Sequence, residues 1–144
     1  MENDINLKVL KELGKGAKMG TDSLSFVSKK VSDEEFQNEL SFQYNQYDDI
    51  VNRVNDIYKK YDLVPDHTDI KKEFMNWMGI QMNTMEDKSN SKIAELLIQG
   101  NTMGIIEGRR LLNNNPSIDS EIRQTLDDFV KLQENTVEKL KIYL

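Results

Sequence analysis

Long stretches in which apolar residues recur at three- and four-residue intervals alternate with short polar stretches along the chain. Such spacing places apolar side chains on one face of an α-helix. It predicts five helices, at about 5–30, 33–61, 69–85, 91–112 and 117–143. The pattern is most regular in the second helix, whose core-facing positions are Phe36, Leu40, Gln43, Tyr47, Ile50, Val54, Ile57 and Tyr61.

The last two helices carry the same kind of pattern. In the fourth, the predicted core-facing residues are Ile93, Leu96, Leu97, Met103, Ile106 and Leu111. In the fifth, they are Ile122, Leu126, Phe129, Gln133, Thr136 and Leu140.

Residues at the predicted helix ends support these bounds. Ser32 followed by Glu35 has the form of a capping box, in which both side chains bond to amides of the first turn. Asn3 or Asp4 can cap the first helix, because a short polar side chain accepts from otherwise unpaired amides. Pro65 lacks an amide proton and stops the second helix.

Glycines recur at four-residue spacing in two of the helices. Gly16 and Gly20 lie in the first, and Gly100, Gly104 and Gly108 in the fourth. Each glycine weakens a helix by roughly 0.5–1 kcal/mol relative to alanine, so a compensating contact is expected. We expect close packing against a neighbouring helix of the bundle, with a homodimer contact through the glycine face as the alternative.

The glycines also reveal an internal repeat. Residues 16–20 and 100–104 share the pattern Gly-x-x-Met-Gly, and an amphipathic helix follows each. Residues 5–61 and 91–143 therefore read as two similar antiparallel hairpins. We predict an all-α fold: a single domain over residues 1–144, built as a four-helix bundle with the helix at 69–85 as an additional crossover helix.

Two hairpins joined by a long crossover resemble the ferritin-like superfamily. The stretch Ile98-Gln-Gly-Asn-Thr-Met-Gly-Ile-Ile and the last twelve residues, from Gln133 to Leu144, also resemble uncharacterised ferritin-like bacterial proteins. The resemblance covers most of the chain and rests on pattern. It implies a ferritin-like four-helix bundle and, since folds host many activities, no particular function.

The ligands that bind two iron ions in that superfamily are missing. Those sites take glutamates from two helices and Glu-x-x-His from two others. This chain has one histidine, His67, and no Glu-x-x-His. The middle of the helices offers neutral glutamines instead, so no metal ligand is carried over and we expect neither a metal site nor a cofactor.

Charge and composition exclude several classes of partner. The net charge is −6 and lysine and arginine are interleaved with acidic residues, which disfavours nucleic acid. No cysteine is present, so disulfides and thiolate chemistry are excluded. No apolar run is long enough to span a membrane, and the acidic start does not resemble a secretory signal. A cytoplasmic protein is the default expectation.

Polar residues interrupt the apolar positions near the middle of the predicted bundle. They form a candidate polar bundle centre, made of Gln43, Tyr47, Glu107, Gln133 and Thr136. Buried polar groups need partners, so these residues can form a hydrogen-bonded layer that sets helix register. The alternative is a pocket for a small polar ligand. Glu107 would need pairing or protonation there, and otherwise faces solvent.

The crossover helix carries a row of large apolar residues. This candidate interaction face consists of Phe74, Met75, Trp77, Met78, Met82 and Met85. Methionine fills irregular gaps in cores and also serves partner-binding surfaces. Contact with the bundle core is the first expectation, a protein-binding or homodimer face the second, and copper binding through thioethers the third.

No nucleophile, general base or ligand motif stands out from the helical pattern. His67 lies in a linker, and the acidic pairs at 48–49 and 127–128 are typical of solvated helix faces. We expect a non-enzymatic bundle that acts as an interaction or structural module. The alternative is an atypical metal- or small-ligand-binding bundle with its site at the polar centre.

Overall fold

The computed structural model describes residues 2–65, 72–84 and 89–144, with the side chains of 4–65, 75–83 and 89–144. Every regular element in these ranges is helical. The elements are α1 (Glu2–Ser28), α2 (Glu34–Lys60), α3 (Lys72–Thr84), α4 (Asn90–Asn114), α5 (Ser120–Leu140) and a short 3-10 helix η1 (Lys141–Tyr143). The predicted all-α class is confirmed.

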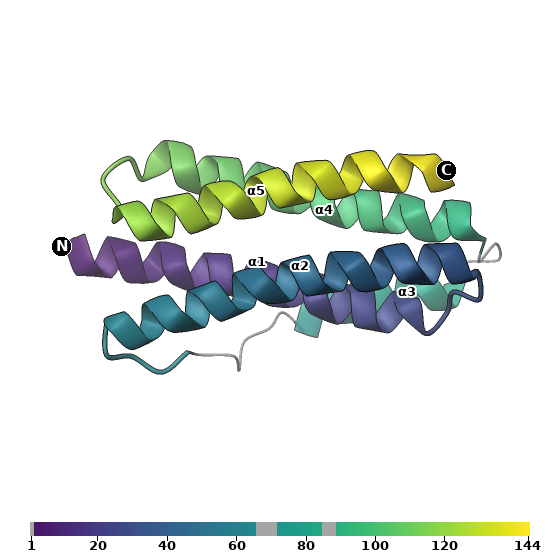
Figure 1. Ribbon diagram of the computed structural model, residues 1–144, viewed down its shortest axis with the longest axis horizontal. Coiled ribbons are helices and arrows are strands. Elements are labelled where there is room, and N and C mark those ends of the chain that lie inside the picture. The colour runs from purple at the N-terminus through teal and green to yellow at the C-terminus, as the bar shows by residue number, and fades with distance from the viewer. Residues whose placement is uncertain (1, 66–71, 85–88) are drawn as a thin grey trace.

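The four long helices form an elongated bundle (Figure 1). Helices α1 and α2 pair as one antiparallel hairpin, α4 and α5 as a second, and α2 packs against α5 between them. Helix α4 begins at the end of the bundle where α2 also begins, so these two helices run in the same direction. Helix α3 lies against α1.

The helix ends differ from the predicted ones by a few residues. Asp33, not Ser32, caps α2, and its Oδ2 accepts from the Phe36 amide at 2.8 Å. Helix α1 begins at Glu2, so Asn3 and Asp4 lie inside the helix and not at its N-cap position. Spacing alone does not show which of two neighbouring polar residues adopts the extended backbone of a cap.

The predicted core positions of α2 and α5 are buried along almost their whole length. Tyr61 is the exception in α2, since it lies at the end of the bundle and donates a hydrogen bond to Asp119. Phe36 stacks on Tyr143 with ring centroids 4.3 Å apart, which joins the start of α2 to the C-terminal turn. A fully buried side chain of this size stabilises by roughly 1.5–3 kcal/mol.

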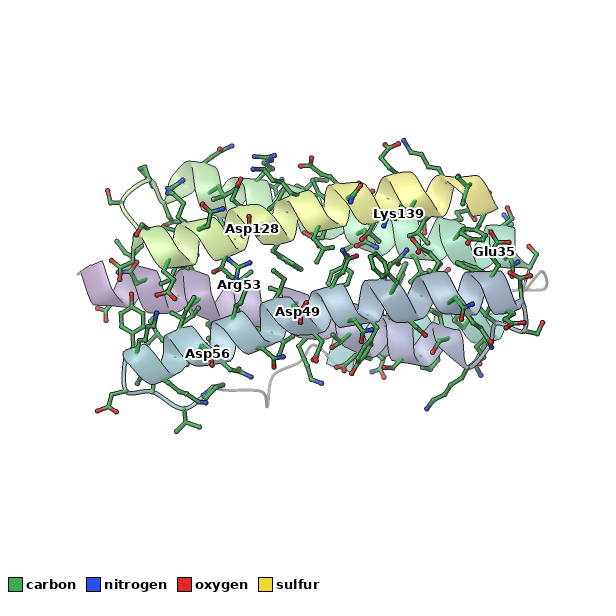
Figure 2. All side chains as sticks on the ribbon, viewed as in Figure 1. Glu35, Asp49, Arg53, Asp56, Asp128 and Lys139 are labelled. Carbon is green, nitrogen blue, oxygen red and sulfur yellow. The ribbon has the colours of Figure 1, made fainter. Side chains whose placement is uncertain are left out.

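Polar groups also join α2 to α5 near the outer surface (Figure 2). Arg53 contacts Asp128 at 2.9 Å and donates to Thr125 at 3.2 Å. The Lys139 ammonium lies 4.4 Å from the centroid of the Phe42 ring. Exposed pairs of this kind contribute about 0–1 kcal/mol each. They therefore add little to the stability of the bundle, but they favour this pairing of the two helices.

The inward face of α4 differs from the predicted one. Ile93, Leu96 and Leu97 are buried, but Met103 and Ile106 are 56% and 47% exposed. Gly104 and Gly108 face the bundle here instead, because side chains of α5 occupy the space beside them. The prediction failed because glycine carries no hydrophobic signal, so the pattern assigned the core positions to its apolar neighbours.

The glycines are matched by large side chains, and the match repeats in both hairpins. A Cβ on Gly20 would lie 2.6 Å from the Tyr47 ring, and one on Gly104 would meet the Gln133 amide. Tyr47 and Gln133 hold equivalent places, since each lies opposite the second glycine of a Gly-x-x-Met-Gly segment. The contact expected to offset the glycines is therefore present within the chain, and side chains rather than helix backbones make it.

Candidate functional site

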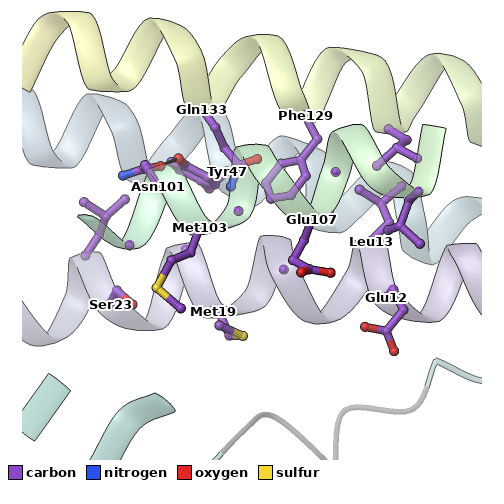
Figure 3. A pocket seen from close by; sticks show the side chains of 18 of the residues that line it. Glu12, Leu13, Met19, Ser23, Tyr47, Asn101, Met103, Glu107, Phe129 and Gln133 are labelled. Carbon is purple, nitrogen blue, oxygen red and sulfur yellow. Dashed lines mark hydrogen bonds between the residues drawn. The ribbon is translucent and has the colours of Figure 1, made fainter. Parts of the chain in front are cut away.

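A cavity of about 360 Å³ lies between α1 and α4, above a floor contributed by α2 and α5 (Figure 3). It reaches the surface where Lys8, Met103 and Glu107 are exposed. Most of its lining is apolar. The lining includes Gly16, Met19, Gly20, Ser23, Tyr47, Met78, Gly100, Asn101, Met103, Gly104, Phe129 and Gln133.

Glycine forms the walls of the cavity on two helices. Gly16 and Gly20 line it from α1, and Gly100 and Gly104 line it from α4. Because glycine has no side chain, the floor residues of α2 and α5 extend between α1 and α4, and space remains above them. The glycines that were predicted to allow close helix packing therefore also leave a cavity that is open to the surface on one side of the bundle.

Tyr47 and Phe129 form the aromatic part of the floor. Their ring centroids are 5.9 Å apart and the rings are nearly perpendicular, at 81°. The Tyr47 hydroxyl donates to Asn101 Oδ1, and Asn101 Nδ2 donates to the Leu97 carbonyl at 2.8 Å. Burial raises the pKa of Tyr47 well above its ordinary value, although a hydrogen bond with Thr136 acts in the opposite direction.

Two polar atoms at the cavity lack partners among the described residues. They are Oε1 of Gln133 and Oγ of Ser23, on side chains that are 4% and 6% exposed. An unpaired buried acceptor costs about 1–3 kcal/mol. Gln43 Oε1 and Asn55 Oδ1 are also unpaired, but neither residue lines this cavity.

The predicted polar centre is brought together only in part. Gln43, Tyr47, Gln133 and Thr136 are buried. Glu107 is exposed at the cavity rim, where Oε1 pairs with Arg110 at 3.0 Å, because α4 turns its glycines inward and its carboxylate outward. Tyr47 and Gln133 reach the cavity, whereas Gln43 and Thr136 do not line it.

Sequence reasoning missed Asn101 and Ser23. Asn101 lies three residues before Gly104 and four after the buried Leu97, so helical spacing could have placed it inward. Ser23 follows Gly20 by three residues in the same way. Both were overlooked because small polar residues are common on solvated helix faces.

The candidate interaction face turns mainly toward the bundle. Met78 and Met82 are each 1% exposed, and Met78 lines the cavity. Met75 and Trp77 are half-buried. The side chains of Phe74 and Met85 lie outside the described residues, as does His67. Met78 and Met82 therefore make the expected contact with the bundle core.

The floor of the cavity carries no charged side chain among the residues that line it. The charged members, Lys8, Glu12 and Glu107, come from α1 and α4 at the mouth. Within the described ranges, no three acidic or histidine side chains lie close enough together to hold a metal ion. The arrangement can enclose a neutral molecule and hydrogen-bond to it.

No helix in the described part of the chain is long and apolar enough to cross a membrane. Comparison of the chain with protein-family models, curated proteins and solved structures finds no match.

Proposed function

We propose that this protein binds a small, uncharged and largely apolar molecule in the cavity between α1 and α4. The observation that carries the proposal is a mostly apolar cavity at the bundle centre, lined also by the polar side chains of Tyr47, Asn101 and Gln133. Ligand sites are typically apolar clefts of roughly 300–1,000 Å³ with a few polar groups that fix orientation. The cavity has these properties and lies at the lower end of that size range.

A ferritin-like architecture is part of the same proposal. Two antiparallel hairpins with α2 and α4 running in the same direction support a single long crossover, as in ferritin-like bundles. Such bundles build their sites from side chains on facing helices. Here the corresponding region offers amides, a phenol and a hydroxyl, which suit a neutral ligand better than a metal ion.

An interaction or structural module is the second candidate. Met103 and Ile106 are exposed on α4 beside the cavity mouth, and apolar residues grouped on a surface mark contact sites. In this alternative a protein partner or a second copy of the chain covers that face of α4.

The methionines allow a site-resolved test of small-molecule binding. Met19, Met78 and Met103 line the cavity, while Met75 and Met82 do not. We expect methyl-¹³C signals of the first three to shift when toluene, cyclohexanol or indole is titrated into the labelled protein. The signals of Met75 and Met82 should move less.

Two serines of α1 provide matched variants. Ser23 lines the cavity, and Ser25 is exposed and does not. Ser23→Leu should fill the cavity and abolish the shifts, and Ser25→Leu should leave them intact. If none of the three probes shifts a cavity methionine in the wild-type protein, the proposed function is wrong.

A further inference from the structure

We propose that α3 is a movable wall of the cavity, and that docking of α3 on the bundle and binding of a ligand strengthen each other. This inference rests on the proposed function and concerns the regulation of the same site. A ligand in the cavity holds α3 against the bundle, and a docked α3 raises the affinity for the ligand. The position of one helix therefore reports whether the cavity is occupied.

The attachment of α3 depends on one face of the helix. It lies outside the four long helices, against α1 (Figure 1). Met78 and Met82, four residues apart, are each 1% exposed, whereas Ile80 is 58% exposed. No atom lies within 4 Å of where a Cβ on Gly79 would be. The segment 75–83 contains no acidic or basic residue, so packing of the methionine face is its main attachment.

Met78 connects this face to the cavity. Within the described ranges it is the lining residue that α3 contributes, and the others come from α1, α2, α4 and α5. Met82 is equally buried but does not line the cavity. A ligand contacts Met78 while α3 is docked and loses that contact when α3 is released. It therefore binds the docked state more tightly.

Thermodynamic linkage makes this effect reciprocal. A ligand shifts the equilibrium toward the state that it binds better, and docking of α3 raises the affinity for the ligand by the same factor. Helix α3 has 13 residues, and isolated helices shorter than about 12–15 residues are marginal in water. Release of α3 from α1 is therefore accompanied by loss of its helical structure.

The single tryptophan of the chain reports on α3. Trp77 is half-buried and packs against the core, but it does not line the cavity. We expect toluene or cyclohexanol to reduce the quenching of Trp77 fluorescence by acrylamide, because each favours the docked helix. Neither compound absorbs at the red edge of the tryptophan band. Hydrogen exchange of the α3 amides should slow in parallel.

Met82→Ala tests the coupling from the opposite direction. It weakens the docking of α3 without changing a residue that lines the cavity. We expect roughly three- to thirtyfold weaker binding of toluene, since the docked fraction falls. The methyl signals of Met19 on α1 and Met103 on α4 give the dissociation constant. Ile80→Ala is the matched control on the exposed side of α3, and it should change the affinity by less than about twofold.

Gly79→Ala provides a rescue of that loss. The added Cβ meets no atom within 4 Å, so its effect on binding comes through the helix propensity of α3. Because α3 is helical when docked and unwound when released, the substitution favours docking. In the Met82→Ala background it should recover affinity by up to about fivefold.

The outcomes separate this inference from the proposed function. Shifts of the cavity methionines with unchanged Trp77 quenching and unchanged hydrogen exchange in α3 overturn the movable wall alone. Wild-type affinity in Met82→Ala, or a loss that Gly79→Ala does not recover, also overturns it and leaves the proposed function standing. If toluene, cyclohexanol and indole all fail to shift a cavity methionine, both proposals are wrong.

Discussion

At the scale of single residues, the packing of this bundle depends on glycines that lie beneath larger side chains. Gly16 faces the Phe129 ring, Gly20 the Tyr47 ring and Gly104 the Gln133 amide. Each glycine gives up helix stability and gains space for a partner that a Cβ would displace. Gly79 differs, because no atom lies within 4 Å of where its Cβ would be.

Alanine substitutions at Gly20 and Gly79 should therefore have opposite effects. In Gly20→Ala the new Cβ would lie 2.6 Å from the buried Tyr47 ring, and overpacking costs about 1–3 kcal/mol. That cost exceeds the gain of about 1 kcal/mol in helix propensity. Gly79→Ala has the gain without the clash. Thermal and urea unfolding should show a lower stability for the first and a higher one for the second; a stabilised Gly20→Ala would contradict the contact.

At the scale of helices, the ends of α2 and α5 are joined by a small polar cluster. Tyr61 donates to Asp119, Lys60 contacts Glu121 at 2.7 Å, and the Asp119 amide donates to Asn6 Oδ1 at 2.8 Å. These contacts bring α1, α2 and the start of α5 together at one end of the bundle. They add to the apolar packing of Tyr61, which is half-buried against the core rather than fully buried as the hydrophobic pattern had predicted.

Stability should consequently fall at alkaline pH. Burial, with the hydrogen bond and negative charge of Asp119, raises the pKa of Tyr61 to about 12 from 10.0. Because the folded-state pKa is the higher one, the contribution of Tyr61 is complete below about pH 10 and is lost between pH 10 and 12. Burial of Tyr47 raises its pKa too and adds to the loss.

Tyr61→Phe isolates this contribution. At pH 7 the variant should be less stable than wild type because the bond to Asp119 is missing. The difference should shrink toward zero by pH 12, where the wild-type phenolate would repel Asp119 and Glu121. Urea unfolding at pH 7, 10 and 12 measures it, and a difference that stays constant with pH would exclude the coupling.

At the scale of the whole molecule, the middle of the bundle holds neutral polar side chains. The missing Glu-x-x-His pairs and the neutral Tyr47 and Gln133 motivate an expectation that the purified protein carries no stoichiometric iron. Elemental analysis after growth in iron-supplemented medium tests it. About two iron atoms per chain, together with oxidase activity, would refute it.

Self-association stays a prediction, but the exposed apolar surface that could support it lies on α4 and not on α3. Met78 and Met82 are buried within the chain, whereas Met103 and Ile106 are exposed on α4. If the protein is a homodimer, Ile106→Asp should dissociate it with little loss of stability, and Met78→Asp should destabilise the chain instead. Sedimentation at micromolar concentrations distinguishes these results, and a monomeric wild type would end the dimer hypothesis.

The sequence by itself determined the helices and their pairing. Apolar spacing in α2 and α5 marks the buried face almost residue by residue, because each side chain's direction follows from the 3.6-residue turn. The Gly-x-x-Met-Gly repeat at 16–20 and 100–104 correctly indicated two antiparallel hairpins, α1 with α2 and α4 with α5. Tyr47 and Gln133 were also recognised as polar residues of the interior.

Tertiary structure alone decided where the interior stays open. Local spacing orients a side chain but does not determine the distance to the next helix, which depends on every residue that packs between them. The same glycines could have brought α1 and α4 together; instead Tyr47, Phe129 and Gln133 rise into the gap and a cavity remains above them. That arrangement also gives two α4 residues, within two turns of each other, different positions: Glu107 lies at the rim and Asn101 lies in the lining, bonded to Tyr47.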